Sequence, residues 1–194
     1  MARTQDAASR ASCGTRGRRV GCVGDVAAGV SAGICENRAM ADRISAGILL
    51  HRTRDGHLEV LLAHPGGPFH ATKDLGAWSI PKGEVELGED LVDVARREFG
   101  EETGHAAPDG GAIPLGTIRQ RGGKLVHAWA LPGDLDPAAA RSNTFSLEWP
   151  PGSGQLEAFP EIDRVAWFDL GEARVRLKDS QVPFLDRLVD ALGR

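Results

Sequence analysis

The sequence predicts an α/β protein, because strand-like and helix-like patterns alternate from residue 43 to the end of the 194-residue chain. Two apolar, strand-like runs come first, and a helical pattern rich in acidic residues follows them. Further strand-like runs then lead to a closing amphipathic helix. The length and the apolar fraction of 41% suit one domain with a sizeable core. We therefore expect one α/β domain over residues 41–194.

Residues 1–40 differ from this domain in composition. They are rich in Ala, Gly, Ser and Arg and show neither clear periodicity nor aromatic side chains. Such a segment cannot bury enough apolar area to offset its ordering entropy, so we expect a disordered N-terminal extension. A targeting peptide and upstream sequence from a misassigned start are alternatives, and Met40, just before the first strand-like run, favours the second.

The first half of the domain contains two expected strands, a loop and a helix. Apolar runs at Ile44–His51 and Leu58–His64 predict strands, and Arg54-Asp-Gly56 between them predicts a hairpin turn. A loop rich in Gly and Pro follows at 64–76. The helix should begin after Asp90, an N-cap residue, and end at Gly104, which suits a left-handed C-cap.

The second half contains three expected strands and a last helix. The strands are Ile113–Gln120, Lys124–Leu131 and Arg164–Asp169. The helix covers about Val182–Leu192, because its apolar side chains recur at helical spacing and form one stripe. Expected strands therefore precede and follow the first helix along the chain, and the second helix comes after the last strand.

Three carboxylates near the end of the first helix share one side of it. At about 100° per residue, Glu98 and Glu102 lie roughly 40° apart, and Glu101 is about 60° from Glu98. The azimuth of Glu98 and Glu102 is apolar one to two turns earlier, at Leu91, Val94 and Ala95. Buried carboxylates without partners are unfavourable by several kcal/mol, so they require a cation. Oxygen ligands favour Mg²⁺ or Mn²⁺, and a solvated acidic helix end is the alternative.

The same segment resembles the box of the Nudix (MutT-like) hydrolase family. The matching residues occupy every fixed position except the last, where His105 replaces an apolar residue. They are Gly83, Glu89, Arg97, Glu98, Phe99, Glu101, Glu102 and Gly104. The resemblance, which covers about residues 41–192, implies an α/β/α sandwich with a mixed β-sheet.

The resemblance also implies an activity and roles for the residues that match. Nudix enzymes hydrolyse nucleoside diphosphates linked to a further group, with Mg²⁺ or Mn²⁺. By position, Glu98 and Glu102 are the principal metal ligands, and Glu101 is a further ligand or a water-mediated contact. Any of these three, with Glu98 preferred, is a candidate general base. Arg97 would orient the carboxylates through an ion pair, for which Glu89 is a candidate partner.

Residues outside the box complete the candidate site. The resemblance implies metal contacts from the carbonyl of Lys82 and from a carboxylate near the last strand, for which we choose Glu161 over its competitors. Those competitors are Asp163, Glu157 and Glu148. The Pro81-Lys82-Gly83 junction is similar to that of diadenosine tetraphosphate hydrolases, so Lys82 is also a candidate phosphate ligand. Further candidates near the cleft are Lys73, His70, Arg119 and His64.

Charge and composition exclude several function classes. Residues 41–194 carry seventeen basic and twenty-four acidic side chains, a net charge of −7, which argues against nucleic acid as a partner. No apolar run approaches the ~20 residues that span a bilayer. Three irregularly spaced cysteines, all before residue 41, fit neither a disulfide framework nor a zinc site, so we expect a cytoplasmic protein.

The expected partner is a small-molecule nucleotide, and the best candidates are dinucleoside polyphosphates. The alternatives are an NTP or nucleotide-sugar pyrophosphohydrolase and an RNA 5′-end pyrophosphohydrolase. A non-catalytic nucleotide-binding sensor is a third possibility, disfavoured because all box glutamates are present. The oligomeric state stays open at this point.

Overall fold

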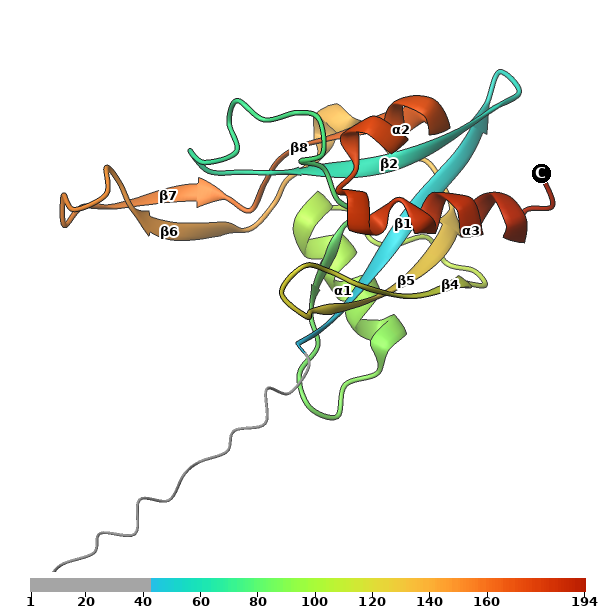
Figure 1. Cartoon of the computed structure of the whole chain (residues 1–194), viewed down its shortest axis with the longest axis horizontal. Coiled ribbons are helices and arrows are strands. Elements are labelled where there is room, and N and C mark those ends of the chain that lie inside the picture. The colour runs from blue at the N-terminus through green and yellow to red at the C-terminus, as the bar shows by residue number, and fades with distance from the viewer. Residues whose placement is uncertain (1–42) are drawn as a thin grey trace, which may run out of the picture. The chain divides into compact units, whose positions relative to one another are not determined.

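The computed structural model describes residues 43–194, and the expectation of a disordered extension over 1–40 lies outside the described residues. Its centre is a six-stranded mixed sheet with strand order β4-β5-β1-β2-β8, in which β3 also pairs with β1 (Figure 1). The β1–β5 pair is parallel and the other pairs are antiparallel. The strands are β1 (Ile44–Arg54), β2 (His57–Pro65), β3 (Lys82–Glu84), β4 (Ile113–Arg119), β5 (Leu125–Pro132) and β8 (Ile162–Asp169).

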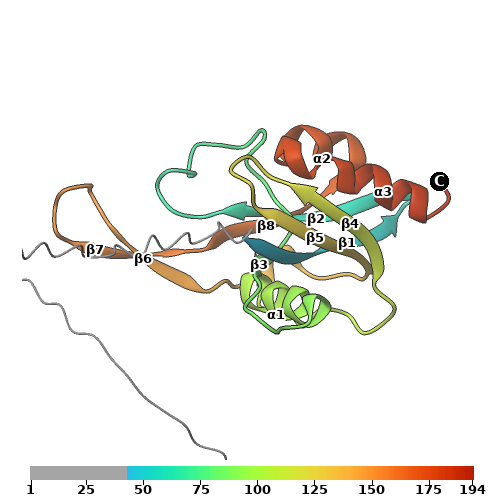
Figure 2. The same cartoon turned by 60° about the horizontal axis from the view of Figure 1, so that its bottom comes forward.

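Helices cover both faces of this sheet, which confirms the expected α/β/α sandwich. Figure 2 shows α1 on one side and α2 and α3 on the other. The helices are α1 (Leu91–Thr103), α2 (Leu170–Arg176) and α3 (Pro183–Ala191), with short 3₁₀ turns η1 (Pro137–Ala139) and η2 (Asp179–Gln181). Within residues 43–194 no helix combines the length and hydrophobicity that crossing a membrane requires.

The side chains of β1 point alternately to the two faces of the sheet, and the core accordingly has two parts. Leu49 faces α2 and α3, whereas Ile48 and Leu50 face α1. Because successive strand residues point to opposite faces, a central strand whose residues 46–50 are all apolar and buried can support both layers. Trp78 is buried in the core, while Trp129 and Trp167 are partly buried against the α1-side core.

The helix that carries the acidic residues begins and ends as the sequence predicts. The Asp90 carboxylate accepts hydrogen bonds from the N–H groups of Val92 and Asp93, at 2.8 and 3.2 Å. Gly104 closes the helix with φ 74°, a left-handed conformation, and its N–H donates to the Gly100 carbonyl. These two caps fix where the acidic face of α1 lies relative to the sheet.

The expected strands and closing helix are present with ends shifted by a few residues, and four elements were not predicted. These are β3, α2 and the hairpin of β6 (Thr144–Glu148) and β7 (Leu156–Pro160). The hairpin forms a separate two-stranded sheet that extends away from the six-stranded sheet in Figure 1. All four are short, and α2 contains Gly171, so local propensity gives little signal for them.

Candidate active site

The end of α1 presents glutamates to the sheet with graded exposure. Glu102 is 9% exposed, and the side chains of Glu98 and Glu101 are 13% and 40% exposed. Val94 and Ala95, one to two turns earlier on the same face, are buried. The inward face of α1 therefore changes from apolar to acidic along its length, as the helical spacing predicts.

Gly83 provides the surface against which the Glu98 carboxylate lies. Strand β3 pairs with β1 so that Gly83 is opposite Ala46, close to the end of α1. A Cβ atom added at Gly83 would lie 1.7 Å from Glu98 Oε2 and 1.9 Å from Glu98 Cδ. Any side chain here would occupy the space of the carboxylate, so close approach, rather than an unusual φ, requires glycine at this position.

Glu102 is a buried carboxylate that forms no ion pair within residues 43–194. Its Oε2 accepts a hydrogen bond from the backbone N–H of Lys82, at 3.0 Å. Burial raises its pKa to about 7, and the negative charges of Glu98 and Glu161 act in the same direction. The charge and N–H group of Lys82 oppose this rise only partly. The folded chain thus holds a carboxylate whose ionised form is poorly compensated.

Arg97 is the cation nearest to the other box glutamates. Its guanidinium lies 2.7 Å from Glu98, 3.3 Å from Glu101 and 3.8 Å from Glu89. Burial nevertheless raises the pKa of Glu98, and Glu101 and Glu161 add to this effect, while Arg97 opposes it. One guanidinium is shared among three carboxylates, so the cluster keeps excess negative charge.

Glu161 comes close to α1 through two consecutive backbone hydrogen bonds. The Asn143 N–H donates to the Glu101 carbonyl at 3.2 Å, and the Glu161 N–H donates to the Asn143 carbonyl at 2.8 Å. The Glu161 charge influences the pKa values of both Glu98 and Glu102.

The three competitors of Glu161 have other partners or positions. Asp163 contacts His64, and the Glu148 carboxylate accepts a hydrogen bond from the Gly154 N–H in the hairpin turn. Glu157 pairs with Leu147 within the separate two-stranded sheet. Glu161 is therefore the carboxylate that the fold connects most directly with the end of α1.

The donor set fits a hard divalent cation, although no three metal-ligating side chains converge on one point among residues 43–194. The available donors are carboxylate oxygens and the Lys82 carbonyl, which are the ligands that Mg²⁺ and Mn²⁺ prefer. The unpaired, buried carboxylate of Glu102 and the cradle at Gly83 are the observations that favour this fit. A cation would relieve the mutual repulsion of Glu98, Glu102 and Glu161.

A lysine that the sequence analysis missed lies near these carboxylates. The Lys178 N–H donates a hydrogen bond to the Trp78 carbonyl at 2.9 Å, and Gln181 Oε1 accepts one from the Ile80 N–H. The segment before α3 therefore runs beside residues 78–80, which lead to Lys82. Lys178 is half-buried, which lowers its pKa, as do the charges of Lys82 and Lys124. Within residues 43–194 neither Lys178 nor Lys82 forms an ion pair. No sequence pattern marks Lys178, because only the sheet topology brings it here.

The other residues predicted to bind the substrate lie in three different parts of the fold. His70 and Lys73 lie in the 66–76 loop, and the pKa of His70 is lowered by burial and by the charges of Lys73 and Lys178. Arg119 ends the edge strand β4 and donates to the Gly123 carbonyl in the β4–β5 turn. His64, expected at the cleft, is fully buried, so that expectation is wrong.

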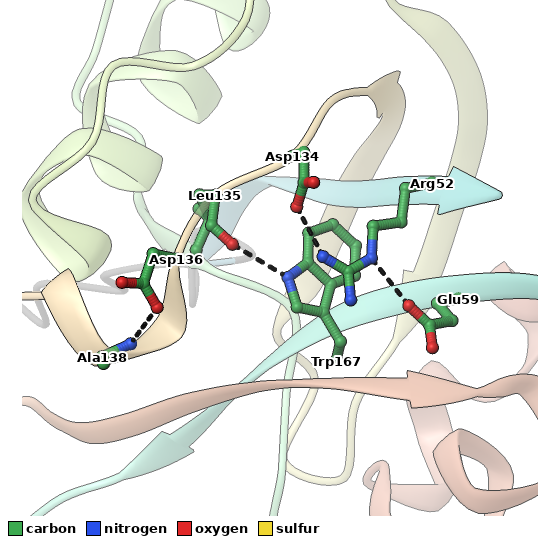
Figure 3. A network of polar contacts seen from close by, with 7 residues as sticks. All are labelled: Arg52, Glu59, Asp134, Leu135, Asp136, Ala138 and Trp167. Atoms are coloured by element: carbon green, nitrogen blue, oxygen red, sulfur yellow. Dashed lines mark hydrogen bonds and ion pairs between the residues drawn. The ribbon is translucent and has the colours of Figure 1, made fainter. Parts of the chain in front are cut away.

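A hollow larger than the one beside the glutamates lies elsewhere on the domain. A hollow of about 620 Å³ lies over Arg52, Arg54 and Trp167, whereas one of about 200 Å³ is lined by Glu102, Arg141 and Arg164. Figure 3 shows some residues of the larger hollow with two of their neighbours, and hydrogen bonds and ion pairs join Arg52 and Trp167 to residues around them. Unbalanced charge, rather than volume, distinguishes the site at Glu102.

Comparisons with known proteins agree with this geometry. A family model described as the NUDIX domain matches residues 41–191. The NUDIX domain of Shewanella oneidensis NrtR, complexed with ADP ribose, has TM-score 0.56 and 18% identity, over 81% of this chain and 93% of that one. A C. elegans Ap4A hydrolase in a binary complex has TM-score 0.54 and 22% identity, over 77% and 98%. A mutT/nudix family protein from Listeria innocua has TM-score 0.50 and 19% identity, over 78% and 94%.

Proposed function

The chain belongs to the NUDIX domain family, and from this premise we propose that it is a divalent-metal-dependent hydrolase of nucleoside diphosphate-linked compounds. We take residues 41–194 as its catalytic domain and the cytoplasm as its location. The observation that carries the proposal is the buried, unpaired carboxylate of Glu102 beside Glu98. Such an arrangement disfavours a purely structural role, because removing charge there would stabilise the metal-free fold.

The proposed roles follow from exposure and contacts. Glu98 and Glu102 are the principal metal ligands, and Glu101, Glu161 and the Lys82 carbonyl are further ligands. The metal, Mg²⁺ or Mn²⁺, neutralises charge on the diphosphate when it is bound. Glu98 is our choice of general base, since its carboxylate is close to solvent yet held by Arg97 at 2.7 Å. Arg97 orients this carboxylate.

The substrate class is inferred from the cationic groups around the carboxylates. Lys82 and Lys178 lack ion-pair partners within residues 43–194, and Lys73 extends positive charge along the 66–76 loop, where His70 offers an imidazole. Groups placed in this way suit phosphates beyond the pair that a metal would hold. We therefore favour dinucleoside polyphosphates, in keeping with the Pro81-Lys82-Gly83 junction, over NTPs and nucleotide sugars.

A panel of substrates with Mg²⁺ tests this proposal. It contains dinucleoside polyphosphates, NTPs, nucleotide sugars, ADP-ribose and capped RNA, and products are identified for each. We expect a tetraphosphate-bridged dinucleotide to have the highest kcat/KM. Preferred turnover of ADP-ribose or an NTP would leave only the hydrolase class, and tight nucleotide binding without turnover would indicate a sensor.

The variants Lys82→Ala and Lys178→Ala test how phosphates are recognised. Each charge-assisted contact contributes about 1.5–3 kcal/mol, so each variant should lower kcat/KM about tenfold or more for the tetraphosphate-bridged substrate. The decrease should be smaller for a diphosphate-bridged substrate. Arg54→Ala is the matched control, because the Arg54 side chain is exposed and lines the other hollow. Equal decreases for both substrates would contradict a role in sensing phosphate-chain length.

A further inference from the structure

The hairpin of β6 and β7 is a two-stranded sheet appended to the domain (Figure 1). Strand alternation places Phe145, Leu147 and Trp149 on the same face of this hairpin. The Trp149 N–H donates to the Gln155 carbonyl at 2.9 Å, so the pairing of the two strands continues as far as this residue. A two-stranded hairpin alone is only marginally stable in water, so its position depends on what this face contacts.

Close contacts join the base of the hairpin to the start of the 66–76 loop. The Gly66 N–H donates to the carbonyl of Glu161, the residue after β7, at 2.8 Å. A Cβ atom added at Gly66 would lie 2.1 Å from the Pro160 carbonyl oxygen, and one added at Gly67 would lie 3.1 Å from Phe145 Cζ. Because two glycines allow this close approach, we expect the loop and the hairpin to keep a fixed relative position.

Further along the same two segments, Phe69 of the loop and Trp149 of the hairpin contact each other. Their rings are edge to face, with centroids 5.5 Å apart and an interplanar angle of 89°. Phe69 is 57% exposed and Trp149 is partly exposed. In an edge-to-face pair one ring covers at most one face of the other, so this pair still presents aromatic surface to a further ring.

The two segments that carry this pair both start beside the candidate active site. The N–H of Asn143, just before β6, donates to the Glu101 carbonyl at 3.2 Å, and the Asn143 carbonyl accepts from the Glu161 N–H at 2.8 Å. In the loop, the residue that follows Phe69 is His70, a candidate phosphate ligand. The aromatic pair therefore lies outward from the proposed metal and phosphate ligands along the hairpin and the loop.

We infer that Phe69 and Trp149 bind the second nucleobase of a dinucleoside polyphosphate by stacking against its face. This inference rests on the proposed function, because it concerns the far nucleoside of that substrate. A nucleobase suits this pair because every base has a π-face that stacks on aromatic side chains. The phosphate chain that carries the base would run along His70 and Lys73. Stacking is tolerant of base identity, so the pair selects for the presence of a second base.

Two substrates with equal numbers of phosphates isolate the second base. A dinucleoside tetraphosphate and a mononucleoside tetraphosphate differ in the second nucleoside alone. Trp149→Leu stays apolar but loses the indole face, so it should raise KM at least fivefold for the dinucleotide and less than twofold for the mononucleotide, with kcat changed less than twofold. Phe69→Leu should behave in the same way, and Trp149→Phe should restore most of the wild-type KM.

Leu156→Ala is the matched control for these variants. Leu156 is 76% exposed and pairs with Glu148, so it lies on the hairpin face opposite Trp149. Its KM should stay within twofold of wild type for both substrates. In Trp149→Leu, an unchanged KM for the dinucleotide, or an equal rise for both substrates, would overturn the inference. An unchanged KM together with loss of a wild-type dimer would assign the aromatic pair to a second copy of the chain instead.

A titration with adenosine in EDTA tests base binding without turnover. Adenosine has a base but no phosphate, and at millimolar concentration it should shift the indole N–H resonance of Trp149 in the wild-type NMR spectrum. The resonances of Trp78, Trp129 and Trp167 should stay in place, and Phe69→Leu should weaken the shift at Trp149. Absence of a shift at Trp149 in a protein that hydrolyses dinucleotides would overturn this inference alone. A shift in a protein without hydrolase activity would overturn only the proposed function.

Discussion

Two clusters of charged side chains lie on the α1 side of the sheet, and they differ in how their charges are matched. Arg52 forms ion pairs with both acids of its cluster (Figure 3): Nε lies 2.7 Å from Glu59, Nη1 lies 2.5 Å from Asp134, and the guanidinium lies 4.1 Å over the Trp167 ring. The Trp167 indole donates to the Leu135 carbonyl. Each charged side chain of this cluster has an oppositely charged partner within the chain, and in this sense we call it the balanced cluster.

The cluster at the end of α1 is not balanced. Arg97 is the only guanidinium or ammonium group in ion-pair contact with the box glutamates among residues 43–194, and Glu102 has no ion pair. Burial raises the pKa values of both Glu98 and Glu102. A balanced network contributes to stability, whereas an unbalanced one makes the metal-free fold less stable and is relieved by a bound cation. Under the proposed function, this difference separates a structural cluster from a functional one.

The largest effect should follow from removing charge in the unbalanced cluster. Glu98→Gln and Glu102→Gln keep side-chain shape but lose a proposed metal ligand, and for Glu98 also the proposed base. Each should lower kcat by at least about 100-fold, the lower end of what general acid–base catalysis contributes. Steady-state kinetics at saturating Mg²⁺ and substrate measures this.

Glu86→Gln is the matched control for these variants. Glu86 is an exposed acid in the approach to the same helix, and its backbone N–H, which the substitution keeps, donates to Glu89. Its kcat should stay within a factor of two of wild type. Near-wild-type turnover in both Glu98→Gln and Glu102→Gln would show that the ligands are assigned wrongly.

The next effect concerns stability without metal. The Glu102 pKa is about 7 in the folded chain against an ordinary value of 4.5, so the unfolded state releases its proton first as pH rises. Metal-free wild type should therefore lose stability between about pH 4.5 and 7, by about 3 kcal/mol in total. Glu102→Gln has no such proton, so in EDTA at pH 8 its Tm should exceed that of wild type by several degrees.

The pH dependence is the decisive part of this experiment. At pH 4.5 the folded state keeps the proton and about half of the unfolded molecules keep it, so the Tm advantage of Glu102→Gln should nearly disappear. Thermal unfolding at pH 4.5, 6 and 8 in EDTA follows the trend, and Mg²⁺ at pH 8 should raise the Tm of wild type more than that of the variant. A Tm difference that does not change with pH would show that Glu102 is not held at raised pKa.

The elements that local pattern specifies were predictable, and those that depend on distant pairing were not. Helix α1 has Asp90 and Gly104 at its ends, and its acidic face follows from periodicity. Strand β3 is three residues long, includes Gly83, and forms because β1 lies beside it. The β6–β7 hairpin and α2 are similarly short and weak in propensity.

The candidate site shows the same division. Glu98, Glu101 and Glu102 follow from spacing, whereas the connection of Glu161 to α1 through Asn143 appears only in three dimensions. Lys178 reaches the site because its segment runs beside Trp78. His64 was expected at the cleft, but strand alternation and the bulge at Asp163 place it inside. Helical spacing in the sequence identifies the residues on one helix face, whereas the topology of the fold determines which residues lie beside them.

The smallest effect should come from the balanced cluster, and it should be confined to stability. Arg52→Met keeps much of the apolar stem over Trp167 but leaves Glu59 and Asp134 without their shared cation. Because Asp134 is largely exposed and Glu59 is about a quarter exposed, solvent compensates much of the loss. We therefore expect the free energy of unfolding to fall by about 1–2 kcal/mol and the Tm to decrease by a few degrees.

The control is Arg54→Met, at an exposed neighbour without a side-chain partner in residues 43–194, which should leave Tm unchanged. Both variants should keep wild-type kcat/KM, which steady-state kinetics beside thermal unfolding measures. A large loss of turnover in Arg52→Met at unchanged Tm would place function in the larger hollow and reverse the assignment of the two clusters.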